Sequence, residues 1–233
     1  MTKLFLIPTT LSNTTSQRVL LPYQLQQIKH LKYFIVETAK TARTHLKQLN
    51  LDTPLQELDI QELNKHQKDL DSLIKPLLNG QDVGLISDCG MPAIADPGSQ
   101  IVRLAHQHNI TVIPFAGPSS LLMALMASGV NGQRFAFTGY IPVDADARVA
   151  KLKQLQELVL KNDQSQIIIE APFRNLQLLR ALIDNLSSQI TLSIAINLMQ
   201  PNEQIISKSI KNWKMLTELP DIHKQEAVFL IGI

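Results

Sequence analysis

Short apolar runs alternate with longer amphipathic stretches along the first half of the chain. The apolar runs predict β-strands over residues 3–7, 33–36, 83–87 and 111–114. The amphipathic stretches between them predict helices over residues 25–31, 38–49, 67–78 and 100–106. Strands that alternate with helices are typical of parallel βαβ units, whose right-handed crossovers place helices on both faces of the sheet.

The second half begins in the same way and then changes character. Helices are predicted over residues 121–127, 149–160 and 176–186, and strands over residues 135–139 and 166–170. Three further strands follow in succession over residues 191–197, 203–207 and 227–231, with only one short helix near Trp213. Successive strands favour a partly antiparallel sheet. We therefore expect an α/β chain with an N-terminal α/β domain of residues 1–116, whose sheet is mostly parallel, and a C-terminal α+β domain of residues 117–233, whose sheet is mixed.

Composition narrows the class of protein. Of 233 residues, 45% are hydrophobic and 18% are charged, which is enough apolar material for a folded core. The net charge of +2 is too small to indicate nucleic-acid binding by itself, although it allows a local basic patch. A single cysteine, Cys89, excludes an intramolecular disulfide and a multi-cysteine zinc site. The sequence has neither an apolar run of about 18 residues nor the pattern of a secretory signal, so we expect no membrane span and a cytoplasmic location.

The glycines indicate where the backbone is free to approach a ligand. Eight of the nine lie between Gly80 and Gly139. The first predicted strand, by contrast, is followed by residues 8–13, which contain no glycine. This segment excludes a Walker A loop at that place and disfavours a G-x-G-x-x-G dinucleotide loop. The ligand-binding backbone is therefore expected in the middle of the chain.

Residues 84–98 are the strongest candidate, because they run from a strand into a loop rich in turns. The loop after a parallel strand is where open α/β sheets bind ligands. Two proline-containing turns within about seven residues exceed what a plain connection needs. We expect Asp96 or Ser99 to cap the next helix, with Pro97 in its first turn. The alternative is a long connection whose polar residues only cap that helix.

Three other segments carry polar groups with two possible interpretations. Ser119 and Ser120 begin a helix, where hydroxyl and N–H groups suit a carboxylate or phosphate, or form an ordinary cap. Residues 170–174 contain a carboxylate, a proline turn and an arginine in succession. They form either a ligand site or a surface turn with a loose ion pair. Lys40 and Arg43 share a helix face that either contacts phosphates or is merely solvated.

The histidines do not have the spacing of a metal site, and we expect no metal. His106 and His108 are two apart and therefore diverge on a helix, and the other four are isolated. His66 lies in a polar loop and is kept as a possible substrate contact. Cys89 lies in the candidate ligand loop without a histidine near it in sequence, which favours a packing role over that of a nucleophile.

At residues 84–98 the sequence resembles the signature LISDAGTPxISDPG of the ribosomal RNA small-subunit methyltransferase I family, within the tetrapyrrole methylase superfamily. Weaker similarities follow in order: residues 37–43 to EDTRHTR, 112–120 to V.PLPGPSA, 134–142 to RF.F.GFLP and 170–174 to YESPHR. The similarity runs from about Leu4 to the C-terminus. It departs from the family at residues 8–17, which replace TPIGNLxDIT and carry Ser12 in place of the glycine. Lys40 stands in place of an arginine, and the chain matches a short form without the C-terminal extension of longer members.

The resemblance implies two domains that bind S-adenosylmethionine in the cleft between them, and a homodimer. Superfamily members hold this cofactor largely with backbone atoms. The matching cofactor-binding positions are Leu11, Gly90, Met91, Pro92, Ile94, Ala95, Ser119, Ser120, Ala171 and Pro172.

The resemblance also implies an acceptor, because ribosomal members of the family methylate a ribose 2′-hydroxyl of small-subunit RNA. The candidate bases that would remove the hydroxyl proton are Asp88, Asp96 and Glu170. The residues expected to contact the RNA substrate are Lys40, Arg43, His66 and Arg174. Two alternatives stay open: a tetrapyrrole carbon methyltransferase, and a non-catalytic relative that binds the cofactor or RNA.

Overall fold

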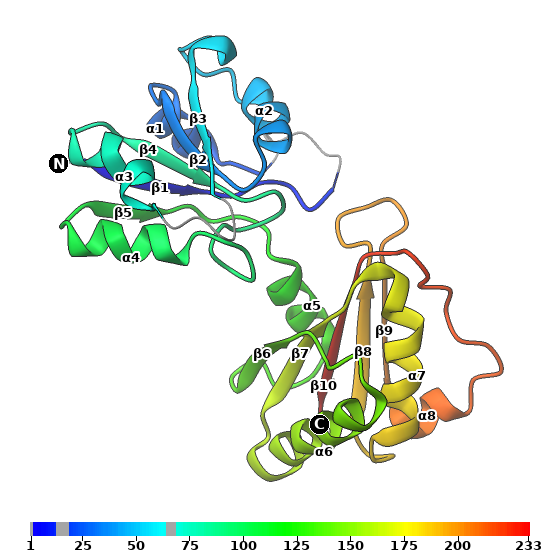
Figure 1. Cartoon of the computed structure of the whole chain (residues 1–233). Helices are drawn as coiled ribbons and strands as arrows, with labels where there is room; N and C mark the ends of the chain where they lie inside the picture. Colours follow the sequence, from blue (N-terminus) through cyan, green and yellow to red (C-terminus); the bar gives the residue numbers. More distant parts are fainter. Residues whose placement is uncertain (1, 13–18, 64–68) are drawn as a thin grey trace. The chain divides into compact units, whose positions relative to one another are not determined.

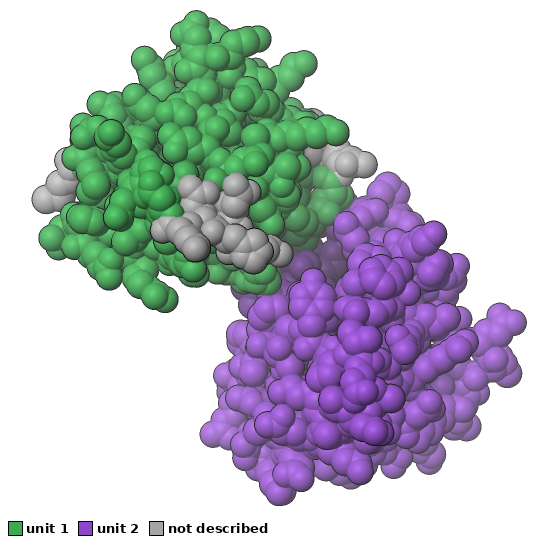
Figure 2. All heavy atoms as spheres, viewed as in Figure 1, with its two compact units in different colours: residues 1–119 green, residues 120–233 purple. Residues whose placement is uncertain are grey.

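The computed structural model describes residues 2–12, 19–63 and 69–233. The chain divides into two compact units, Met1–Ser119 (unit 1) and Ser120–Ile233 (unit 2) (Figure 2). Each unit has a five-stranded sheet of its own. Each also has its own clusters of buried hydrophobic residues, so each unit has a separate core.

The sheet of unit 1 is parallel throughout, which confirms the expected fold class (Figure 1). Its strands, in spatial order, are β3 (Asp59–Glu62), β2 (Tyr33–Val36), β4 (Val83–Ile86), β1 (Lys3–Ile7) and β5 (Thr111–Pro114). Strand β3 was not predicted. Its sequence, Asp-Ile-Gln-Glu, has one apolar residue, because an edge strand with exposed side chains does not need the apolar pattern of a buried one.

Helices cover both faces of this sheet, as the alternating pattern predicted. They are α1 (Pro22–Ile28), α2 (Ala39–Gln48), α3 (Asp71–Leu78) and α4 (Ser99–Gln107), with a 3₁₀ turn η2 at Leu55–Glu57. Successive residues of a strand face opposite sides. Phe5 therefore packs with α1 and α2, whereas Leu4 packs with α3 and α4. The predicted start of α3 at residues 67 and 68 lies outside the described residues.

Unit 2 has a mixed sheet, again as expected. The spatial order is β6 (Phe135–Gly139), β7 (Ser165–Ile169), β10 (Ala227–Gly232), β8 (Thr191–Ile196) and β9 (Gln204–Ser209). Strands β6 and β7 are parallel, and the other neighbours are antiparallel. The long crossover through α6 (Ala145–Asn162) permits the parallel pair, and shorter connections join the antiparallel strands.

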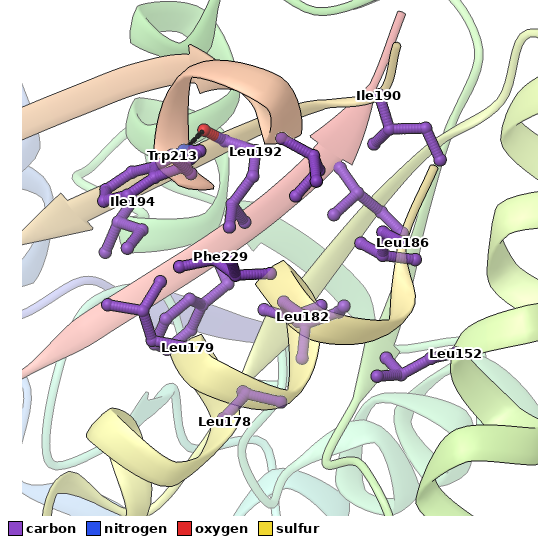
Figure 3. Packing of buried hydrophobic residues seen from close by; sticks show 14 of the residues in the cluster. Leu152, Leu178, Leu179, Leu182, Leu186, Ile190, Leu192, Ile194, Trp213 and Phe229 are labelled. Carbon is purple, nitrogen blue, oxygen red and sulfur yellow. Dashed lines mark hydrogen bonds between the residues drawn. The ribbon is translucent and has the colours of Figure 1, made fainter. Parts of the chain in front are cut away.

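One face of this sheet packs against α6, α7 (Asn175–Asn185) and the short α8 (Ile210–Lys214). In Figure 3, leucines of α7 lie beside Phe229 of β10, and Leu152 approaches from α6. Trp213 of α8 is 1% exposed and donates its indole N–H to the Leu192 carbonyl oxygen at 2.9 Å. The hydrogen bond satisfies the one polar group of this buried side chain.

Helix α5 (Ser120–Ser128) packs against the opposite face. The Ser207 hydroxyl of β9 donates to the Ser128 carbonyl oxygen of α5 at 2.7 Å. The neighbouring Ile206 packs into the cluster beneath α7 and α8, and adjacent strand residues face opposite sides. Within residues 2–12, 19–63 and 69–233, every helix is too short or too polar to cross a membrane.

The packing of β4 gives a test of the unit 1 core. A Cβ added at Gly84 would lie 2.7 Å from Phe34 Cδ1 and 2.8 Å from Ile7 Cδ1. We expect Gly84→Ala to lower the free energy of unfolding by about 1–3 kcal/mol, because both side chains must leave their packed positions. Urea denaturation followed by circular dichroism measures this loss.

Gly132→Ala is the matched control, since a Cβ there would lie more than 4 Å from every described atom beyond its neighbours. We expect that change to stay within about 0.5 kcal/mol of the parent. Equal losses in the two variants would contradict the packing argument.

Candidate functional site

The parallel strands of unit 1 all end at one edge of their sheet, and most of the sequence-predicted residues follow those ends. We call this the carboxyl edge. It comprises the last residue of β3, Glu62, and the segments after the five strands: residues 8–12, 37–38, 63, 87–98 and 115–119. An open parallel sheet binds its ligands at such an edge.

Three of these segments pack directly on one another. The Thr9 N–H donates to the Gly90 carbonyl oxygen at 2.8 Å, which joins the loop after β1 to the loop after β4. Gly90 has a φ of +76°, and a Cβ there would lie 3.1 Å from Leu11 Cδ2 and 3.2 Å from the Pro118 carbonyl oxygen. A Cβ at Gly117 would lie 2.2 Å from Pro8 Cβ. Both positions therefore require glycine for the loops to approach this closely.

The loop of residues 91–98 turns sharply and borders a cavity. Ala93 and Ala95 adopt φ values of +65° and +63°, a left-handed conformation that is unfavourable for a residue with a side chain. Such conformations cluster at ligand sites. The cavity measures about 260 Å³. It is lined by Met91, Pro92, Ala93 and Ile94 of the loop, Ser99 and Val102 of α4, Leu6 of β1, Pro114 of β5, and Phe115 directly after β5.

The start of α4 differs from the prediction. Gly98, with a φ of +131°, occupies the N-cap position, and the helix begins at Ser99. The expectation that Asp96 or Ser99 caps this helix is therefore wrong, and Pro97 precedes the helix instead of lying in its first turn. The sequence rule favours a polar cap, but here the chain enters the helix through a turn that only glycine adopts readily. Asp96 lies half-buried in the loop.

Asp88, a predicted base, lies at the end of β4 against the start of α2. Its Oδ2 accepts a hydrogen bond from the Thr38 hydroxyl at 2.7 Å. Its N–H donates to Glu37 Oε2 at 3.1 Å. Glu62, at the end of β3, accepts the Ala39 N–H at 2.6 Å, where a carboxylate is favoured by the helix dipole. Three carboxylates thus converge on the first turn of α2, and Asp88 stays half-buried.

His45 joins this group, although the sequence suggested an isolated residue. Burial lowers its pKa, and a hydrogen bond to the backbone of Asp88 and the charge of the Asp88 carboxylate partly oppose that effect. His45 follows Thr38 by seven residues, about two helical turns, which places both on one face of α2. The seven-residue spacing was the signal in the sequence that could have linked His45 to Thr38. It indicates a polar group only because the structure places Asp88 beside both residues.

The exposed side of α2 carries the predicted basic residues. Lys40 and Arg43 are both exposed there. Lys47 is exposed one turn after Arg43. His66, another predicted substrate contact, lies outside the described residues. Among the described residues, no three His, Cys, Asp or Glu side chains are grouped so as to hold a metal ion.

In unit 2 the predicted residues Glu170 and Arg174 bind each other. Glu170 follows β7 and its side chain is 6% exposed. Its Oε1 accepts the Arg174 Nε–H at 3.0 Å and the Ala171 N–H at 2.7 Å. Arg174 belongs to a 3₁₀ turn, η3 (Pro172–Arg174), and its guanidinium carbon lies 5.4 Å from the centre of the Phe173 ring. The Arg174 side chain is 27% exposed, so the ion pair is partly buried and differs from a loose surface contact.

The remaining predicted positions divide between the units. Ser119 is buried at the end of unit 1, and Ser120 is the first residue of α5 in unit 2. Ala171 and Pro172 lie in the turn between β7 and α7. Cys89 is exposed beside Gly90.

The sequence also matches a known protein family. The family model for tetrapyrrole (corrin/porphyrin) methylases matches residues 25–213. A ribosomal RNA small subunit methyltransferase I from Pasteurella multocida is 34% identical over 160 residues, which cover 68% of the chain and 56% of that protein. A protein of the same name from Hydrogenobaculum is 28% identical over 212 residues, covering 90% of the chain and 86% of that protein.

The crystal structure of the methyltransferase CobJ has the same fold. It matches with a TM-score of 0.62 over 99% of the chain and 93% of CobJ, at 14% sequence identity. The chain spans only a little more than half the length of the Pasteurella relative.

His45 yields a prediction about pH. Because burial lowers its pKa from 6.5, His45 is neutral in both the folded and unfolded states above about pH 7. As the pH falls below 6.5, the unfolded state takes up a proton first, so the free energy of unfolding decreases until the pH passes the lower, folded pKa. We expect His45→Gln to remove this component, so that its stability falls less than that of the parent between about pH 7.5 and pH 5.

Urea denaturation at a series of pH values measures the difference. His106→Gln, at an exposed position on α4 of the same unit, is the control and should follow the parent curve. If His45→Gln also follows the parent, then burial of the imidazole does not set its protonation.

Proposed function

Because the chain belongs to the tetrapyrrole (corrin/porphyrin) methylases, we propose that it is an S-adenosylmethionine-dependent methyltransferase acting on a ribose 2′-hydroxyl of ribosomal RNA. The observation that carries the proposal is the carboxyl edge of unit 1, where closely packed loops border an apolar cavity. The names of the relatives from Pasteurella and Hydrogenobaculum support the RNA acceptor. A cytoplasmic location and a homodimer complete the proposal and rest on the family resemblance.

The residues of the carboxyl edge suit part of this cofactor. The cavity of about 260 Å³ is slightly smaller than the usual ligand pocket of about 300–1,000 Å³, so it fits one portion of a nucleoside-sized molecule. The left-handed conformations of Ala93 and Ala95 are of the kind that clusters at ligand sites. In unit 1, we propose that the cofactor is held by Leu11, Gly90, Met91, Pro92, Ile94, Ala95 and Ser119. Ser120, Ala171 and Pro172 are the corresponding proposals in unit 2.

When bound, the cofactor supplies an electrophilic methyl group. The chain must position the ribose hydroxyl and accept the proton that it loses. Of the three candidate bases, we favour Asp88, because it is half-buried and its orientation is fixed by the Thr38 hydroxyl. The Glu170 side chain is 6% exposed and bound to Arg174, which suits a structural role. Asp96 is the second candidate.

Exposed cations of α2 are the proposed phosphate contacts. Lys40 and Arg43 extend from the helix whose N-cap residue, Thr38, donates a hydrogen bond to Asp88. Phosphate contacts fix the register of a nucleic acid without reading its sequence. This arrangement would hold an RNA backbone on the same side of unit 1 as the proposed base.

Cofactor binding tests the first part of the proposal. We expect calorimetric titration with S-adenosylmethionine and with S-adenosylhomocysteine to give saturable binding at one site per chain. Gly90→Ala should weaken both by about tenfold or more, because its Cβ would press on Leu11 and Pro118. Gly129→Ala is a matched control, because Gly129 has a φ of +79° and a Cβ there would be more than 4 Å from every described atom beyond its neighbours.

Methyl transfer tests the second part. Small ribosomal subunits and their isolated RNA are offered with labelled cofactor, and the modified nucleoside is identified by mass spectrometry. Label in a 2′-O-methyl nucleoside supports the proposal. Transfer to a precorrin but not to RNA would indicate a tetrapyrrole methyltransferase instead. Cofactor binding without transfer to either acceptor would favour the non-catalytic alternative.

The phosphate contacts predict a specific salt dependence. A double variant, Lys40→Gln with Arg43→Gln, removes two proposed contacts. We expect the slope of log affinity against log salt to become shallower by roughly 1.4–1.8, since each neutralised phosphate contributes about 0.7–0.9. Affinity for ribosomal RNA across a salt series measures this slope.

The control is Lys153→Gln with Lys161→Gln, which removes the same charge from exposed positions of α6. An equal change of slope in the control would show that net charge matters and that α2 makes no particular contact.

A further inference from the structure

Two aromatic side chains of unit 2 are unusually exposed. The chain has seven phenylalanines, three tyrosines and one tryptophan, and all of them lie in the described residues. Phe173, at 65%, and Tyr140, at 62%, are the most exposed of these. Neither ring is among the site residues that the sequence predicts. Their exposure matters because both project from fixed backbone.

The two residues follow neighbouring strand ends. Strands β6 and β7 are parallel, with Gly139 opposite Ile168. Tyr140 comes directly after β6, and Phe173 lies in η3, shortly after β7 ends. Parallel neighbours end at the same edge of a sheet. The chain therefore presents both rings at one edge of unit 2.

The backbone that follows Tyr140 is held by two kinds of contact. Ile141, the next residue, is 2% exposed within the hydrophobic cluster of unit 2. Arg148 of α6 donates its Nε–H to the Pro142 carbonyl oxygen at 3.1 Å and a further hydrogen bond to the Val143 carbonyl oxygen. The loop after Tyr140 is thus fixed by one buried side chain and one arginine, while the tyrosine itself is left exposed.

The backbone around Phe173 is held in a similar way. The Lys224 N–H donates to the Pro172 carbonyl oxygen at 3.1 Å. Arg174, the next residue, is anchored by Glu170, and its guanidinium carbon lies 5.4 Å from the centre of the Phe173 ring. The ion pair with Glu170 therefore also orients the aromatic side chain beside it.

We propose that Tyr140 and Phe173 form a stacking platform for unpaired nucleobases of the RNA acceptor, with Arg174 supporting the Phe173 ring. Single-stranded RNA is bound by exposed aromatic rings and arginine planes on which bases stack. Rings presented from fixed loops lose little conformational freedom when a base stacks on them. This inference rests on the proposed function and extends it to how the substrate is held.

Direct binding tests the platform without methyl transfer. The probe is a fluorescent single-stranded 12-nucleotide RNA, and the reference is the same sequence annealed to its complement. We expect Tyr140→Leu and Phe173→Leu each to weaken single-strand binding by at least about fivefold, because leucine keeps apolar bulk but offers no flat ring. Duplex binding should change by less than about twofold, since paired bases do not present their faces.

Matched variants separate stacking from general disruption. Tyr140→Phe and Phe173→Tyr keep a ring and should retain the parent affinity for the single strand. Tyr23→Leu removes a tyrosine that is 57% exposed in unit 1 and should also have no effect. Circular dichroism shows whether each variant is folded.

Three outcomes would overturn the platform. One is unchanged single-strand affinity in both leucine variants. Another is an equal loss for single strand and duplex. The third is a loss of S-adenosylhomocysteine binding or of self-association with RNA affinity intact, which would assign the rings to the cofactor or to a second copy of the chain. A different result would contradict the proposed function: the parent protein would bind the RNA but transfer no methyl group to it.

Discussion

The hydrogen bond from the Thr9 N–H to the Gly90 carbonyl oxygen, 2.8 Å long, joins the loops after β1 and β4. It forms only because Gly90 leaves room for Leu11 and Pro118, and Gly117 leaves room for Pro8. The position of the whole 87–98 loop depends on this close approach. The cavity, the left-handed alanines and the start of α4 at Ser99 all follow from where that loop leaves the sheet.

Two carboxylates at strand ends illustrate how the surroundings of a side chain give chemically similar groups different roles. The Glu170 side chain is 6% exposed, and Arg174 and the Ala171 N–H bind the same oxygen atom, so it fixes the turn between β7 and α7. Asp88 is half-buried, accepts a hydroxyl hydrogen bond from Thr38 and lies beside a histidine whose pKa is lowered by burial. The first arrangement rigidifies its surroundings, whereas the second leaves a carboxylate that a substrate can approach.

Prediction succeeded where the pattern was local and failed where packing set the outcome. Strands β1, β2 and β5 of unit 1 have the expected bounds because each is a short apolar run. Strand β3 was missed because an edge strand needs no apolar pattern. The cap of α4 was wrong because the preceding loop enters the helix through a positive φ at Gly98. His45 is isolated from other polar groups along the chain, and Asp88, the residue that influences its pKa, is far away in sequence.

By itself, the sequence determined the alternation of strands and helices and the parallel and mixed sheets, since these depend on periodicity and on residues close along the chain. Tertiary structure alone decided which polar groups meet. Glu37 binds the Asp88 N–H across 51 residues, and Tyr140 and Phe173 come to one edge through the pairing of β6 with β7. Such contacts arise from strand order and packing, and side-chain spacing along a single element does not encode them.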